Sequence, residues 1–238
     1  MHVQVAVAKV GKYATRESGD TFEMVERPHG GLSLVLADGQ RSGRGAKVIS
    51  NLVARKTVSL LAEGTRDGVA ARAAHDYLFA ARGGQVRADL QILSLDLESR
   101  TIVISRNTDC GALVIEGGVT RWLDRESKPI GIYRNTRPAI DELPLSPGLG
   151  VTIFSDGVRT AGQRTAATFD VAAVVEAVLH APAGTPPTAQ RLADHLLATA
   201  VKADGGFPQD DISVVALLVS PEPLADQVRR LNVVFPLP

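Results

Sequence analysis

Apolar residues recur along this 238-residue chain with two different periods, which predict separate groups of strands and helices. Short alternating or continuous apolar runs predict three strands in the first third, at 3–8, 21–25 and 32–37. From Gly45 the apolar residues fall at helical spacing instead, and Gly64 is typical of a residue that ends a helix. A second helix is indicated over 69–81 and stops at Gly83.

The middle third contains four apolar runs that pair through short turns. The runs cover 90–97, 101–105, 112–115 and 119–123, and the turns are Glu98-Ser99-Arg100 and Glu116-Gly117-Gly118. Each pair predicts an antiparallel hairpin, because such short turns leave no room for the crossover helix that parallel strands require.

The last third predicts two more strands, at 151–154 and 212–219, and between them two helices, at 171–179 and 192–201. Strands grouped in hairpins, with helices grouped separately, indicate an antiparallel α+β fold. The last residues contain four prolines. We therefore expect one domain over residues 1–220, followed by a C-terminal tail at 221–238.

Charge and hydropathy argue against two classes of protein. Lys and Arg together number 26, as do Asp and Glu, so the chain lacks the basic excess of a nucleic-acid-binding protein. Apolar stretches such as 212–219 are far shorter than the roughly 20 residues that a membrane span needs. The N-terminus lacks the pattern of a signal peptide. We expect a cytoplasmic protein that binds neither nucleic acid nor a membrane.

Catalysis by cysteine, histidine or serine is not indicated. Cys110 is the only cysteine, and the Cys-x5-Arg loop of thiol phosphatases is missing because residue 116 is Glu. The five histidines show no zinc-binding spacing, and the chain has neither a phosphate-binding P-loop nor a G-x-S-x-G motif.

Aspartates stand beside turn residues at the ends of four predicted strands. Asp38 and Asp156 each follow an apolar strand, Asp210 precedes one, and Asp20 comes directly before the strand at 21–25. Carboxylates at the rim of one sheet repel one another unless a cation lies between them, and Mg²⁺ and Mn²⁺ favour such oxygen ligands. Asp-Gly is also among the commonest turn dipeptides. The spacing alone therefore leaves a metal site and four ordinary turns open.

Four ordered motifs resemble those of a known family. They are SGDTF (18–22), LADGQRSGRGA (36–46), FSDGV (154–158) and QDDISVVAL (209–217). In order and spacing they are similar to motifs of the type 2C metal-dependent (PPM) protein phosphatases. The similarity is to their bacterial branch, typified by the stage II sporulation protein E (SpoIIE) phosphatase and the small feedback phosphatase of the general stress response. The resemblance covers nearly the whole chain.

The resemblance implies an αββα sandwich, in which two antiparallel sheets are flanked by helices, and two bound metal ions, Mn²⁺ or Mg²⁺. By position, Asp38 would bridge both ions, and the Gly39 carbonyl would help to hold one of them. Asp20 would support that second ion, while Asp156 and Asp210 would complete the ligands of the first.

Two further residues have weaker parallels in the family. Asp211 adjoins Asp210 and is expected to support a ligand rather than to bind metal itself. Arg16 stands four residues before Asp20 and is similar to the phosphate-holding arginine of eukaryotic members, although a surface arginine is the alternative. Relatives often have Asn-Ala-Gly-His-Pro where this chain has residues 107–111, so their substrate specificity is not carried over.

The implied activity is that of a protein serine/threonine phosphatase. A hydroxide activated by two metal ions would hydrolyse phosphoserine or phosphothreonine on a bacterial regulatory protein, such as an anti-sigma-factor antagonist or a stress-signalling scaffold. Catalysis would rest on Asp38, Asp20, Asp156 and Asp210. A non-catalytic binding module of the same fold and a hydrolase of small phosphoesters are the alternatives. Retention of the four aspartates argues against the first of these.

Overall fold

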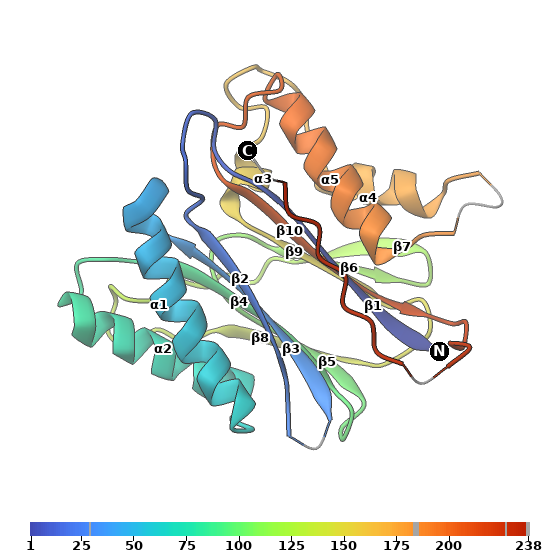
Figure 1. The fold of residues 1–238 in the computed structure, drawn as a ribbon, viewed down its shortest axis with the longest axis horizontal. Coiled ribbons are helices and arrows are strands. Elements are labelled where there is room, and N and C mark those ends of the chain that lie inside the picture. Colours follow the sequence, from blue (N-terminus) through green and yellow to red (C-terminus); the bar gives the residue numbers. More distant parts are fainter. Residues whose placement is uncertain (29, 183–185, 227, 237–238) are drawn as a thin grey trace.

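The computed structural model describes residues 1–28, 30–182, 186–226 and 228–236 and arranges them in four layers, helix, sheet, sheet and helix (Figure 1). Every strand pair among these residues is antiparallel. The expected antiparallel α+β fold, an αββα sandwich, is therefore confirmed.

Each sheet has five strands. The first sheet has the order β1 (His2–Val10), β10 (Ile212–Ser220), β9 (Gly150–Phe154), β6 (Ala112–Glu116) and β7 (Val119–Leu123). The second has the order β2 (Asp20–Glu26), β3 (Gly31–Gly39), β4 (Ala88–Asp96), β5 (Thr101–Asn107) and β8 (Ala139–Pro144).

The helices cover the two outer faces. They are α1 (Gly43–Ala62) and α2 (Asp67–Arg82) on the second sheet, α4 (Val171–Leu179) and α5 (Ala189–Ala203) on the first, and the short α3 (Asp156–Thr160) directly after β9. Residues typical of helix ends stand where three of these helices begin or end. Asp170 accepts hydrogen bonds from the first-turn amides of α4, Thr188 accepts one at the start of α5, and α2 ends at Gly83 in the left-handed conformation.

Successive side chains of the central strands point to opposite faces of their sheet and so contribute to different apolar cores. One core lies between the sheets, and one lies beneath the helices on each outer face. On β3, Leu34 and Leu36 pack between the sheets, whereas Val35 and Ala37 pack beneath α1 and α2. The same period of two holds for the other central strands, because successive side chains of a strand point to opposite faces. The core between the sheets is therefore built from every second residue of the strands.

Two elements were missed by the sequence patterns. The edge strand β8 buries only Ala139 and Leu143, so its apolar signal is weak. Helix α3 is a single turn of five residues, too short to show a helical period. In addition, Asp38-Gly39 lies within β3, and Asp156-Gly157 opens α3, so neither Asp-Gly pair is the ordinary turn that was left open.

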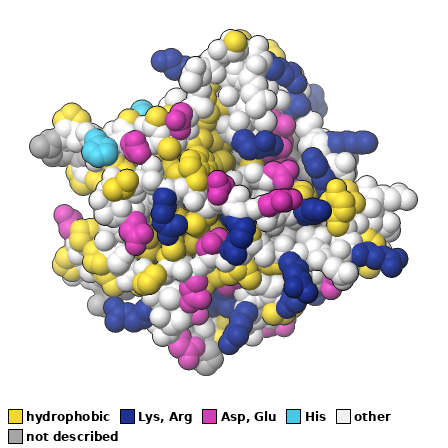
Figure 2. Space-filling view, turned by 180° about the vertical axis from the view of Figure 1, so that it is seen from behind, with side chains coloured by type: hydrophobic (Ala, Val, Ile, Leu, Met, Phe, Trp, Pro, Cys, Tyr) yellow, Lys and Arg dark blue, Asp and Glu magenta, His cyan; other side chains and the backbone are white. Residues whose placement is uncertain are grey.

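The described residues after β10 contain no helix or strand, and Arg229 among them forms an ion pair with Glu26 of β2 at 2.6 Å. The domain boundary at residue 220 stays a prediction. Among the described helices, none is both long and apolar enough to cross a membrane. Figure 2 shows basic and acidic side chains interspersed over one face of the molecule, in keeping with the zero net charge.

Shortening a side chain in the core between the sheets is expected to be costly. Leu93 on β4 is fully buried there, so Leu93→Ala should lower the free energy of unfolding by about 2–5 kcal/mol. Leu97, directly after the same strand, is 47% exposed, and Leu97→Ala should change it by about 0.5 kcal/mol or less. Urea denaturation of both variants measures the difference, and equal losses would contradict the assigned core.

Candidate metal centre

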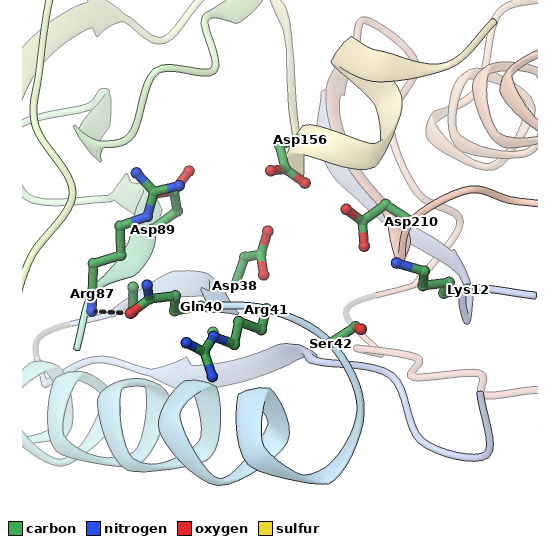
Figure 3. Close-up of a pocket in the computed structure, with 11 residues that line it drawn as sticks. Lys12, Asp38, Gln40, Arg41, Ser42, Arg87, Asp89, Asp156 and Asp210 are labelled. Atoms are coloured by element: carbon green, nitrogen blue, oxygen red, sulfur yellow. Dashed lines mark hydrogen bonds between the residues drawn. The ribbon is translucent and has the colours of Figure 1, made fainter. Parts of the chain in front are cut away.

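A cavity of about 400 Å³ opens where several strand ends meet (Figure 3). Four of its eleven lining residues are aspartates, three are cationic and the others are small or polar: Lys12, Asp38, Gly39, Gln40, Arg41, Ser42, Arg87, Ala88, Asp89, Asp156 and Asp210. The cavity thus brings together three of the four aspartates that the sequence singled out. The fourth, Asp20, is buried and does not line it.

Strand register places three of the acidic residues side by side. In the second sheet Asp20 of β2 pairs with Asp38 of β3, and Asp38 pairs with Asp89 of β4. Directly opposed residues of neighbouring strands share one face of the sheet. On β3 that face is the one where Leu34 and Leu36 pack between the sheets. The aspartates therefore continue the apolar rows of the inter-sheet core to its open end.

The other two aspartates come from the first sheet. Asp156 is the first residue of α3 and follows β9 closely, whereas Asp210 lies two residues before β10. Strands β9 and β10 are neighbours in that sheet. Figure 3 shows the carboxylates of Asp38, Asp156 and Asp210 around one common space. The two sheets therefore supply acidic groups from opposite sides of the cavity.

Two glycines allow this convergence because their backbones pass close to other segments. A Cβ at Gly39 would lie 2.0 Å from the carbonyl oxygen of Ala46 on α1, and one at Gly157 would lie 2.2 Å from the carbonyl oxygen of Asp211. Neither distance is possible for a real side chain. Glycine therefore follows Asp38 and Asp156 for close packing rather than for turn geometry.

The carboxyl groups strongly perturb one another. Burial, followed by the charges of Asp20, Asp156, Asp89 and Asp210, raises the pKa of Asp38 to about 11. Burial likewise raises the pKa of Asp20 to about 6 and that of Asp89 to about 6. The pKa of Asp210 is also raised, mainly by burial. Without a bound cation, the site therefore favours a protonated Asp38.

Asp20 lies in a polar setting behind Asp38. Its Oδ2 accepts a hydrogen bond from the Ser213 hydroxyl at 2.6 Å, whereas its buried Oδ1 has no hydrogen-bond partner among the described residues. Its backbone oxygen accepts hydrogen bonds from the ammonium groups of Lys9 at 2.8 Å and Lys47 at 2.6 Å. These contacts tie β2 to β1 and α1, and they leave one carboxylate oxygen free for a further ligand.

Asp211 and Arg16 lie apart from the cavity lining. The Asp211 Oδ1 accepts a hydrogen bond from the Lys12 amide at 2.9 Å, and its Oδ2 accepts one from the Gly19 amide at 2.8 Å. Both oxygens are thus used to hold the segment between β1 and β2. Arg16 is exposed and is not among the residues that line the cavity.

Sequence patterns missed Asp89 and the three cationic residues of the cavity. Asp89 is the second residue of β4, and it accepts a hydrogen bond from the Thr108 hydroxyl at 2.5 Å. No turn or glycine marks it, and two helices separate β3 from β4 in the chain, so only their register reveals its position beside Asp38.

The chemistry of the site suits a hard divalent cation. Over the described ranges, no group of three or more His, Cys, Asp or Glu side chains is arranged to hold a metal ion on its own. The carboxylates of Asp38, Asp89, Asp156 and Asp210 instead line a cavity with space for water, so the donors there are oxygen atoms. The unpartnered Oδ1 of the buried Asp20 is a further oxygen beside Asp38. Mg²⁺ typically keeps several water ligands and binds few carboxylates directly. The residues present therefore fit a hydrated Mg²⁺ or Mn²⁺ ion.

A side chain at Gly39 should disrupt the site. Gly39→Ala is expected to lower the free energy of unfolding by about 2 kcal/mol or more, because its Cβ would overlap Ala46. Gly45 lies within α1 with nothing near its missing Cβ, so Gly45→Ala should be neutral or stabilising by up to ~1 kcal/mol. Denaturation curves of the two variants measure the two changes in the free energy of unfolding. Equal changes in both variants would refute the close contact at Gly39.

Replacing the ionisable carboxyl of Asp38 by a neutral amide should stabilise the metal-free protein, because folding would no longer require that carboxyl to take up a proton. Since the pKa of Asp38 is about 11 in the folded chain against an ordinary value of 3.8, stability should fall as pH rises above about 4. In chelator at pH 8, Asp38→Asn should raise the melting temperature by at least ~2 °C, and the gain should vanish near pH 4. Asp194→Asn, at an exposed position of α5, is the control. A wild type more stable than Asp38→Asn at pH 8 would contradict the repulsion.

Known proteins share both the sequence pattern and the fold. The family model of stage II sporulation protein E (SpoIIE) matches residues 28–220. No protein of curated function matches the chain. A structure of the PP2C phosphatase domain with part of the regulatory domain of SpoIIE from Bacillus subtilis superposes with a TM-score of 0.78 at 19% identity, covering 92% of this chain and 64% of that one. This chain thus spans less than two thirds of that protein.

Two further structures share the fold. The RsbU and RsbW domains of a Mycobacterium tuberculosis protein match with a TM-score of 0.75 at 18% identity, over 93% of this chain and 62% of that one. The catalytic domain of the serine/threonine protein phosphatase PstP, in complex with two manganese ions, matches with a TM-score of 0.70 at 15% identity, over 92% and 98%. Identities this low show a common fold alone, but the family model covers most of the sequence. The chain therefore belongs to the SpoIIE family.

Proposed function

We propose that this protein is a metal-dependent protein serine/threonine phosphatase. The observation that carries the proposal is the convergence of Asp38, Asp156 and Asp210 on one cavity from two sheets, in a member of the SpoIIE family. Such a cluster of half-buried carboxylates is stable when cations offset their charge. The manganese complex of PstP, which has the same fold, supports two Mn²⁺ or Mg²⁺ ions as the cations.

The chain offers a consistent set of ligands for these ions. Asp38, Asp156 and Asp210 present carboxylates to the cavity, and the Gly39 carbonyl lies at its wall. Asp20 supplies the unpartnered Oδ1 behind Asp38. Asp89 extends the set proposed from sequence, because it stands beside Asp38 in the register and lines the same cavity.

When bound, two divalent ions lower the pKa of a bound water and offset charge on the phosphoryl group. The residues of the chain hold the ions and orient their ligands. Asp38 gives up the proton that its raised pKa retains in the metal-free state, so metal binding should release protons. Asp211 fixes the segment before β2 through its two amide contacts and so keeps Asp20 in register with Asp38.

The proposed substrate is phosphoserine or phosphothreonine on a regulatory protein of the cytoplasm, of the anti-sigma-factor antagonist or stress-signalling scaffold type. Support comes from the family and from the RsbU-containing and PstP structures. The cavity is open to solvent and polar, which suits a charged phosphoester presented by another protein.

Hydrolysis should depend on both the metal and Asp38. With Mn²⁺, the wild type should hydrolyse an aryl phosphate and a phosphoserine protein, and chelator should abolish both activities. Asp38→Ala should reduce turnover by more than ~100-fold, since loss of a residue that merely supports a metal ligand already costs about 10–100-fold. Asp194→Ala, on the exposed face of α5, is the matched control and should retain full activity.

Activity that ignores chelator or survives Asp38→Ala would refute the assigned site. Metal-dependent turnover of the aryl phosphate without any phosphoprotein would instead favour a hydrolase of small phosphoesters. Metal binding without turnover of either substrate would favour a non-catalytic module.

A further inference from the structure

We propose that Arg41 and Arg87 bind the phosphoryl group of the substrate at the mouth of the carboxylate cavity, an inference that rests on the proposed phosphatase function. Both residues line the cavity. Arg41 follows β3, and Arg87 directly precedes β4. The two arginines therefore stand near Asp38 and Asp89 on neighbouring strands (Figure 3).

Hydrogen bonds hold the two arginine-bearing segments together. The Gln40 amide donates to the Arg87 carbonyl at 3.2 Å, and the Arg87 amide donates to the Gln40 side-chain oxygen at 3.2 Å. Gln40 thus joins the segment after β3 to the start of β4. This link fixes the distance between the two backbones while leaving both guanidinium groups unconstrained.

Neither guanidinium is committed to a partner within the described part of the chain. No hydrogen bond or ion pair of the Arg41 or Arg87 side chain is present there, and both residues are exposed. By contrast, Arg27 donates to Asp67 at 3.2 Å, and the buried Arg106 donates to the Cys110 carbonyl at 3.2 Å. The charge of Arg87 acts on Asp89, but both guanidinium groups keep their hydrogen-bond donors available at the cavity.

The backbone at Arg41 adds a second, independent observation. Its φ of 74° is left-handed, a conformation that costs an L-residue about 1–2 kcal/mol and costs glycine almost nothing. Gly43, two residues later, takes the same conformation with a φ of 72°. An arginine kept at such a position beside a cavity points to a use for its side chain, since strain of this kind clusters at ligand-binding sites.

Charge favours a phosphate group as the ligand. Four aspartates alone would repel a phosphoester, but two divalent ions would neutralise them, and the cationic side chains would then dominate the mouth. The planar guanidinium donates two parallel hydrogen bonds to phosphate oxygens, which makes arginine well suited to this ligand. Arg16 is a less suitable candidate because it does not line the cavity.

The test compares three arginine variants in Mn²⁺. Arg41→Gly keeps the left-handed backbone and removes only the side chain, while Arg87→Ala changes an exposed residue. Arg100→Gly is the matched control, because Arg100 is also exposed and left-handed, with a φ of 56°, in the turn after β4. That turn lies at the opposite end of β4 from Asp89.

Inorganic phosphate is the probe, as a product inhibitor and as a ligand in calorimetry. Arg41→Gly and Arg87→Ala should each weaken phosphate binding about 10-fold, as expected for the loss of a charge-assisted hydrogen bond. The KM values for an aryl phosphate and a phosphoserine peptide should rise by the same factor. The Mn²⁺ affinity of both variants should stay within about twofold of wild type, and Arg100→Gly should match wild type throughout.

Unchanged phosphate binding in both variants would overturn the inference. A KM increase confined to the peptide would also overturn it, because the arginines would then contact acidic neighbours of the phosphoserine. A loss of Mn²⁺ affinity large enough to explain the weaker phosphate binding would assign them to the metal site instead. If the phosphatase proposal itself is wrong, the wild type will show no turnover, which is a separate result. Calorimetry with phosphate still tests the role of the two arginines in that case.

Discussion

Mutual repulsion among carboxylates at the open end of the inter-sheet core is the constraint on which this structure depends. The rows that pack Leu34 and Leu36 between the sheets end in Asp38, which faces Asp20 and Asp89 across two strand pairs. An apolar residue at the end of each row would be more stable in the isolated chain. The raised pKa of Asp38 reflects the unfavourable free energy of ionising a carboxyl group beside other carboxylates. A divalent cation bound between them would offset that free energy.

Much of the surrounding structure keeps these acids close in spite of their repulsion. Gly39 and Gly157 let α1 and the segment before β10 approach the acidic residues more closely than any side chain would allow. Lys9 and Lys47 converge on the backbone oxygen of Asp20, and Asp211 holds the segment that precedes it. The site is therefore built mainly on strands and helix starts, which hold their geometry better than loops do.

The sequence predicts most of the architecture but only part of the site. Apolar periods revealed nearly every strand and helix, because burial on one face imposes those periods directly. They missed β8, whose edge position buries few side chains, and α3, which is a single turn. Asp38, Asp156 and Asp210 were found because each lies in a recognisable motif beside glycine or a strand.

Asp89 and Arg87 were out of reach for a different reason. Their place at the cavity depends on the pairing of β3 with β4, which are separated by α1 and α2 in the chain. Register between such distant strands follows from the packing of the whole sheet and has no local signal. Arg41 lies within the motif at 36–46, but that pattern gave its side chain no role. Motifs thus identified the acidic centre, whereas its cationic mouth became visible only in three dimensions.

Anomalous diffraction from crystals of the protein grown with Mn²⁺ would show directly whether the aspartates bind metal. Manganese peaks are expected inside the cavity, in contact with the carboxylates of Asp38, Asp156 and Asp210, and they should be lost in crystals of Asp38→Ala. Saturating Mn²⁺ that left the cavity without a peak, or that bound only at other acidic surface residues, would contradict metal binding by these aspartates.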